Sequence, residues 1–201
     1  MRTRTTTRLI EDLRDPANTD AWVGFDARYR PVLIGFARTL GFSPDDAAEL
    51  AQQTLARFVV AYRDGRYVRG NGRLSSWLIG IARNVGLEMR RGARRVRAAG
   101  DTVLGGVEAA LPDEAHLTVI WEKERRAATL AQAMDVLRGS DRMEPHTFRA
   151  FELFALRGVP APEVATQCGI EVDAVYVIKN RLTKRLREIV RELTTLYSEG
   201  D

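Results

Sequence analysis

The sequence predicts an all-α fold in which two small helical domains are joined by a linker. Apolar residues recur at three- and four-residue steps through most of the 201 residues, which is the period of helices that bury one face. Between them, residues 98–114 are rich in Gly and small residues and break this period. The predicted organisation is therefore a first domain at 8–97, a linker at 98–114 and a second domain at 115–196.

Composition bounds the class of protein. Apolar residues make up 45% of the chain, which is ample for packed cores, and the net charge is +4 with a pI near 9.6. No run of about 18 apolar residues occurs, so we expect no membrane association. The N-terminus lacks the apolar core of a signal peptide, and a single cysteine, Cys168, excludes an intramolecular disulfide. These features favour the reducing cytoplasm.

The first domain is expected to begin with two helices. Residues 8–14 predict a short helix, and Thr19 or Asp20 is the expected N-cap of a longer one that Gly41 ends. Pro31 falls inside this second pattern and should kink or split the helix. Its apolar stripe is expected in the core and comprises Trp22, Phe25, Tyr29, Leu33, Phe36, Ala37 and Leu40.

The next helix carries an acidic, Gln-bearing face. Ser43 is a favourable N-cap, Pro44 suits the first helical position, and Asp46 lies where a capping-box acid would. One side of the helix is apolar up to Tyr62, and Asp64 and Gly65 end it. The opposite side carries Asp45, Glu49, Gln52, Gln53 and Arg57. Taken alone, this side fits an ordinary solvated face.

Arginine dominates the segment that follows. From Arg66 to Arg97 the chain has nine arginines and one acid, Glu88. A polar Gly/Asn turn leads into a helix for which Ser75 or Ser76 is the expected N-cap. A solvated basic helix end is one explanation, because cations favour helix C-termini. The density of guanidinium groups exceeds that need and suits contact with phosphates and base edges.

The end of the chain predicts a helix-turn-helix within the second domain. A short helix at 161–167, a turn around Gly169 and a long helix capped by Asp173 have the required apolar and small positions, including Ala165 and Cys168 in the core. The outward face of the long helix is polar and basic near its start, as in helices that read the major groove. An amphipathic helix with a basic solvated side is the alternative. His116 and His146 are interpreted as structural.

Several of these blocks together resemble the extracytoplasmic-function (ECF) sigma factors of the sigma-70 superfamily. The resemblance rests on residues 46–54 (DAAELAQQT), 77–84 (WLIGIARN), Arg90 with Arg91, and 174–182 (AVYVIKNRL). It covers residues 8–97 and 115–194 in the family's order. It implies a transcription initiation factor that directs bacterial RNA polymerase to promoters.

The resemblance also implies three sets of site residues. Those for binding core polymerase are Asp45, Asp46, Glu49, Gln52 and Gln53. Those for the −10 element are Arg69, Asn71, Arg73, Arg83, Asn84, Arg90 and Arg91, with Arg69 to Arg73 at the pocket for an extruded base. Those for the −35 element are Ala174, Tyr176, Val177, Lys179, Asn180, Arg181, Thr183 and Lys184. Tyr67 and Trp77 are candidate stacking aromatics, although Trp77 also suits the core.

The expected partners are core RNA polymerase and promoter DNA, and an anti-sigma factor is a further candidate. No converging acid/base set, metal-ligand spacing or phosphate loop occurs, so we expect no enzyme activity, metal or cofactor. The alternative function is a helix-turn-helix regulator that binds operator DNA without polymerase. It explains the second domain and leaves the acidic face and the arginine block without a shared purpose.

Overall fold

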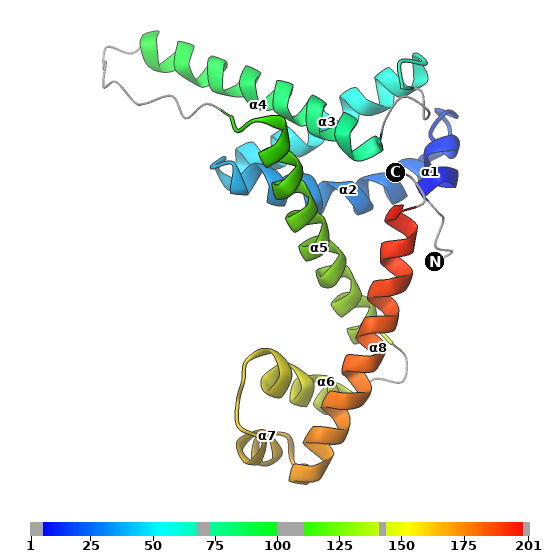
Figure 1. Cartoon of the computed structure of the whole chain (residues 1–201), viewed down its shortest axis with the longest axis vertical. Coiled ribbons are helices and arrows are strands. Elements are labelled where there is room, and N and C mark those ends of the chain that lie inside the picture. Colours follow the sequence, from blue (N-terminus) through cyan, green and yellow to red (C-terminus); the bar gives the residue numbers. More distant parts are fainter. Residues whose placement is uncertain (1–5, 68–72, 100–110, 141–143, 199–201) are drawn as a thin grey trace. The chain divides into compact units, whose positions relative to one another are not determined.

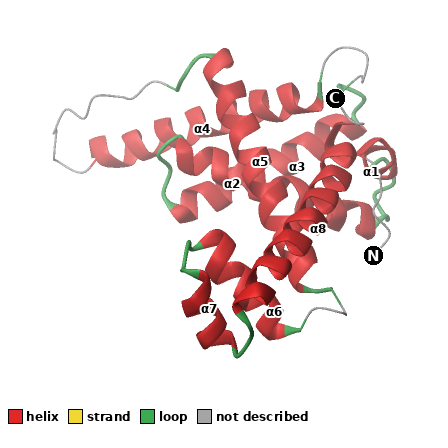
Figure 2. Cartoon of the chain, turned by 60° about the horizontal axis from the view of Figure 1, so that its bottom comes forward, coloured by secondary structure: helices red, strands yellow, loops and turns green. Residues whose placement is uncertain are grey.

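Helices form every regular element of the described chain. The structure, a computed structural model, describes residues 6–67, 73–99, 111–140 and 144–198. No strand occurs in these ranges, which confirms the all-α prediction (Figure 2). The chain forms two compact units: unit 1 comprises Met1–Ala128 and Leu196–Asp201, and unit 2 comprises Thr129–Thr195.

Unit 1 is built from four helices and the first half of a fifth (Figure 1). These are α1 (Thr6–Asp12), α2 (Thr19–Thr39), α3 (Pro44–Arg63), α4 (Leu74–Ala99) and the start of α5 (Glu114–Arg138). Helix α3 packs against both α2 and α4. Phe58 of α3 lies at the centre of the core, stacked 5.0 Å from Phe25 and 5.9 Å from Tyr62 between ring centroids. The faces of α3 and α4 that turn away from this core define the exposed surfaces of the unit.

The structure corrects the expected N-cap of α2, and of the kink or split expected at Pro31 it excludes the split. Asn18, and not Thr19 or Asp20, is the N-cap, because its side-chain carbonyl accepts a hydrogen bond from the Ala21 backbone at 3.1 Å. Pro31 does not split the helix, which continues to Thr39. The Pro31 side chain is exposed while Val32 and Leu33 beside it are buried, so packing of the apolar stripe holds the helix together across the proline.

The starts of α3 and α4 differ in how well the sequence located them. The Ser43 hydroxyl accepts a hydrogen bond from the Asp46 backbone at 3.1 Å, which confirms Ser43 as the N-cap. The Asp46 carboxylate accepts from the same hydroxyl at 2.7 Å, and not from the Ser43 backbone N–H as in a capping box. Helix α4 begins at Leu74, before the expected caps Ser75 and Ser76. Leu74 is buried, so its place in the core draws the first turn one residue earlier.

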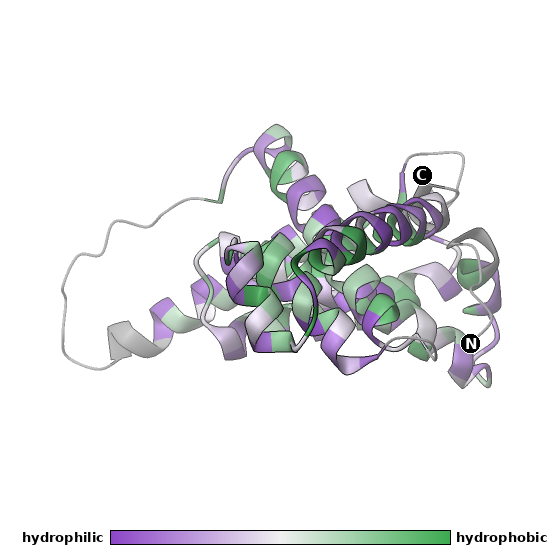
Figure 3. Cartoon of the chain, turned by 90° about the horizontal axis from the view of Figure 1, so that it is seen from below, coloured by the Kyte–Doolittle hydropathy of each residue, from purple (hydrophilic) through white to green (hydrophobic). Residues whose placement is uncertain are grey.

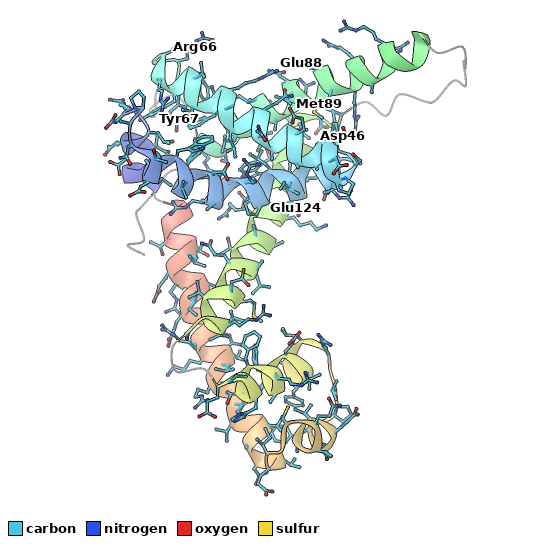
Figure 4. The ribbon with its side chains drawn as sticks, turned by 180° about the vertical axis from the view of Figure 1, so that it is seen from behind. Asp46, Arg66, Tyr67, Glu88, Met89 and Glu124 are labelled. Atoms are coloured by element: carbon cyan, nitrogen blue, oxygen red, sulfur yellow. The ribbon has the colours of Figure 1, made fainter. Side chains whose placement is uncertain are left out.

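The first half of α5 belongs to unit 1. Leu117 and Trp121 are buried in its core, and the Trp121 ring meets Phe36 of α2 edge-on at 6.0 Å. Glu124 accepts a hydrogen bond from the Thr39 hydroxyl at 2.9 Å, and Figure 4 labels it where α5 meets α2. A Cβ at Gly35 would collide with the Glu124 carboxylate. Residues 115–128, expected in the second domain, therefore pack with the first.

Unit 2 contains the rest of α5, α6 (Pro145–Phe151), a π-helical turn η2 (Glu152–Leu156), α7 (Ala161–Cys168) and α8 (Val172–Ser198) up to Thr195. Glu144 is the N-cap of α6 and Pro145 is its first residue. Gly169 has φ +66°, and the Ile170 N–H donates a hydrogen bond to the Ala165 carbonyl at 3.1 Å. Helix α7 therefore ends in a left-handed turn. Asp173 lies within the first turn of α8 and does not precede it as a cap.

The helices carry both hydrophobic and hydrophilic residues (Figure 3), as burial of one face requires. Among the described helices none is sufficiently long and apolar to span a membrane. Cys168, the last residue of α7, is half-buried and does not belong to the core, where the sequence had placed it. Each histidine lies beside a carboxylate, His116 3.1 Å from Asp113 and His146 3.3 Å from Glu144.

Replacing Trp121 should test whether α5 stabilises unit 1. Because this ring is 1% exposed, Trp121→Ala should lower the free energy of unfolding by about 3–5 kcal/mol in chemical denaturation. Val119 on the same helix is 68% exposed, and Val119→Ala should change it by less than about 0.5 kcal/mol. Equal effects of the two substitutions would show that α5 does not contribute to this core.

Candidate nucleic-acid and protein interfaces

Helix α3 presents an exposed acidic stripe. Asp45, Glu49 and Gln52 are all exposed, and their spacing places them on one side of the helix. Figure 4 shows Asp46 at the start of α3 and Arg66 just beyond its other end. Asp46 is also exposed, but its carboxylate accepts the Ser43 hydroxyl and so serves the N-cap as well.

A chain of hydrogen bonds runs from this stripe to α4. The Gln53 amide donates to Glu49 at 2.7 Å, and the Arg57 guanidinium approaches the Gln53 carbonyl at 3.4 Å. Arg57 then donates two hydrogen bonds to Glu88 of α4, at 2.9 and 2.6 Å. This fork-shaped pairing connects α3 to α4 at the surface and restrains the relative position of the two helices.

The ion pair keeps Glu88 charged. Hydrogen bonding from Arg57 lowers the pKa of the Glu88 carboxyl, and the positive charges of Arg57 and Arg91 lower it further. The same bond raises the pKa of Arg57. Both side chains are about half exposed, so solvent screening limits the contribution of the pair to stability. Glu88, the single acid of the arginine segment, is thus directed to α3.

The stripe on α3 extends further than the sequence interpretation placed it. Ala56 and Val60 are exposed and follow Gln52 at steps of four residues, so they continue the same side of the helix. Val60 is 59% exposed, so the stripe ends in an apolar side chain that is open to solvent. In the sequence, the four-residue steps from Gln52 to Ala56 and Val60 were the signal that could have predicted this extension.

Helix α4 presents an exposed basic face. Arg83, Asn84 and Arg91 lie at spacings of one, seven and eight residues that place them on one side of the helix, and all three are exposed. Arg73, just before the helix, is exposed too. Arg94 and Arg95, which the sequence interpretation did not assign to a site, extend this basic face by one turn. Of the other predicted −10 residues, Arg69 and Asn71 lie outside the described part of the chain.

Arg90 differs from its neighbour Arg91. It is half-buried, its guanidinium donates to the Leu40 carbonyl at 2.8 Å, and it lies 5.1 Å from the centre of the Phe42 ring. Arg90 therefore anchors α4 to the turn between α2 and α3. The structure brings Arg83, Asn84 and Arg91 together and directs Arg90 toward the protein interior.

The two candidate stacking aromatics lie in the core cluster. Tyr67 is buried and Trp77 is half-buried, with ring centroids 5.1 Å apart. Both rings also meet Phe58, at 6.0 and 5.7 Å. These contacts tie the end of α3 to the start of α4.

In unit 2, α8 presents a mixed apolar and basic surface near its start. Tyr176 and Val177 are 49% and 64% exposed, and Asn180 and Lys184 follow on the same side. Tyr176 meets Phe154 edge-on at 5.3 Å, which orients its ring. Of the remaining predicted −35 residues, Arg181 is exposed, while Ala174, Lys179 and Thr183 are half-buried.

The comparison with known families bears on unit 1. Residues 25–96 match the family model of sigma-70 region 2. The matched segment includes α3, nearly all of α4 and most of α2, and thus both exposed faces of unit 1. The match is to one domain of the sigma-70 family of transcription initiation factors. Region 2 of these factors binds core RNA polymerase. No curated protein matches the chain.

The different contacts of Arg90 and Arg91 can be tested by stability. Arg90→Ala removes a charge-assisted hydrogen bond and a cation–π contact and should lower the free energy of unfolding by about 1–3 kcal/mol. Arg91→Ala, one residue away and exposed, should change it by less than about 0.5 kcal/mol. The measurement is urea denaturation of both variants, and a smaller loss in Arg90→Ala than in Arg91→Ala would contradict the assignment.

Proposed function

We propose that this chain is an ECF-type sigma factor that directs core RNA polymerase to promoters and assists DNA melting. The observation that carries the proposal is the pairing of two exposed faces, acidic on α3 and basic on α4, within a segment that matches sigma-70 region 2. An acidic face suits a basic protein partner, and an arginine face suits DNA.

The acidic stripe of α3 is the proposed docking surface for core polymerase. Asp45, Glu49 and Gln52 would meet basic residues of the polymerase coiled coil, and opposite charges would speed the encounter. Val60, at the far end of the stripe, would add apolar area to this contact. Gln53 would contribute indirectly, because its side-chain amide donates a hydrogen bond that orients the Glu49 carboxylate.

The basic face of α4 is the proposed surface for the −10 element. Guanidinium groups of Arg83 and Arg91 would hold phosphates, and Asn84 would hydrogen-bond a base edge. Extruding a base costs a few kcal/mol, which contacts in the Arg69–Arg73 loop would offset. The Arg57–Glu88 pair would keep this face at a set distance from the polymerase contact. The chain performs no chemistry in this scheme, since the polymerase synthesises the RNA.

Helices α7 and α8 are the proposed helix-turn-helix for the −35 element. The left-handed turn at Gly169 and the buried Ala165 allow the close reversal that this motif needs. The start of α8 would enter the major groove, with Tyr176, Val177 and Asn180 toward base edges. Lys184 and Arg181 would contact phosphates.

Capture on core polymerase tests the proposal. Glu49→Lys reverses the charge at the centre of the stripe and should weaken binding of the chain to core polymerase about tenfold or more. Glu11→Lys makes the same charge change at an exposed residue of α1 and should leave binding unchanged. The wild-type chain should also support run-off transcription from a randomised promoter pool. Binding of a palindromic duplex as a dimer, without affinity for polymerase, would favour the helix-turn-helix regulator instead.

A second test separates base reading from phosphate contact on α8. Lys184→Ala should weaken promoter binding for all sequences and reduce the slope of log affinity against log salt by about 1. Asn180→Ala should change which sequences are preferred, by about 1–3 kcal/mol at one position. An equal loss on every sequence in Asn180→Ala would contradict a base-reading role.

A further inference from the structure

Two glycines of α4 have no role in the fold of the described chain. Of the ten glycines with described surroundings, eight are explained locally. A positive φ favours glycine at Gly41, Gly65, Gly158 and Gly169. A Cβ would press on a neighbouring atom at Gly24, Gly35, Gly86 and Gly139. Gly80 and Gly92 have neither reason: their φ is not positive, and an added Cβ would meet nothing within 4 Å.

Gly80 lowers the stability of α4 and fills no packing need among the described residues. It lies in the second turn of α4, where glycine destabilises a helix relative to alanine because its backbone loses more freedom on folding. Gly86 in the same helix shows the contrast, because a Cβ there would come within 3.2 Å of Phe42 and its glycine permits close packing. The benefit of glycine at position 80 is therefore to be sought beyond the residues that the structure describes.

The neighbours of Gly80 indicate what approaches it. Ser76 precedes it by four residues, and Arg83 and Asn84 follow by three and four, so these side chains surround it on one side of the helix. All three are exposed, as is Gly80 itself. A bare stretch of helix backbone thus lies within the basic face. Nucleic acid is the partner that such a face attracts, and glycine permits a helix backbone to approach a ligand closely.

We propose that Gly80 is the point of closest approach between α4 and a promoter DNA strand, an inference that rests on the proposed function of unit 1. The strand passes over the bare backbone at Gly80, and the flanking Arg83 and Asn84 reach its phosphates and bases. A methyl group at position 80 holds the strand away from the helix and lengthens the contacts on both sides at once. Gly80 is in this sense a positioning residue for the −10 interaction.

Gly92 provides a matched control. It lies on the same helix in equally open space, and 12 residues turn it about 120° away from Gly80 around the helix axis. Alanine at either position should raise the melting temperature of the chain by about 2–8 °C, because both replacements favour the helix. Only Gly80→Ala should lower the affinity of the chain for promoter DNA.

The experiment uses the full-length chain bound to core RNA polymerase and a promoter duplex selected by the wild-type chain from a randomised pool. Gly80→Ala should raise the melting temperature, keep affinity for core polymerase within about twofold, and reduce promoter affinity about tenfold. Gly92→Ala should raise the melting temperature and leave promoter affinity within about twofold. Gain of stability with loss of promoter binding is a result that damage to the fold would not produce.

Three results would overturn the inference. Promoter affinity in Gly80→Ala equal to that of the wild type would overturn it alone, with the proposed function intact. Failure of the wild-type chain to bind core polymerase or to select any promoter would overturn the proposed function and this inference together. A tenfold loss in Gly92→Ala as well would assign the effect to helix stiffness and would also count against close approach at Gly80.

Discussion

The arrangement of unit 1 depends on burial of one side of α3 and one side of α4 in a single core. Phe58 is at its centre, in ring contact with residues of α2, α3 and α4. Because each helix must turn its apolar stripe inward, the opposite stripes are left to solvent, acidic on α3 and basic on α4. The two proposed partners would therefore meet adjacent helices that the same aromatic residues hold. Loosening this core would alter both surfaces together.

Contacts at the surface further restrain the positions of α3 and α4 that the core determines. The Arg57–Glu88 pair joins α3 and α4, and Arg90 ties α4 to the carbonyl of Leu40 at the end of α2. Glu88 and Arg90 both belong to the arginine-rich segment from Arg66 to Arg97, and both contact other helices of the unit. Net charge alone thus overstates the number of cations available to DNA, because some serve packing. The cations that remain on the outer side are those whose helical spacing sets them away from α2 and α3.

Helix α5 shows that a chain segment can complete a domain from which a linker separates it in sequence. Trp121 fills a position against Phe36, and the absence of a side chain at Gly35 makes room for Glu124. Glycine serves packing there, whereas at position 80 it serves none within the described residues. The same residue type therefore carries different meaning according to its surroundings, which local sequence does not contain.

By itself, the sequence determined the helical class, the N-cap at Ser43, the turn at Gly169 and the exposed acidic and basic faces. These follow from local spacing and backbone chemistry, which a chain carries wherever it folds. The tertiary structure decided the cap at Asn18, the start of α4 at buried Leu74, and the placement of residues 115–128 in unit 1. It also separated Arg90 from Arg91. The Asn18 cap is a local alternative to Thr19 and Asp20, since it bonds the Ala21 backbone. The others depend on atoms far apart in the chain, because packing selects which local alternative buries the most apolar surface.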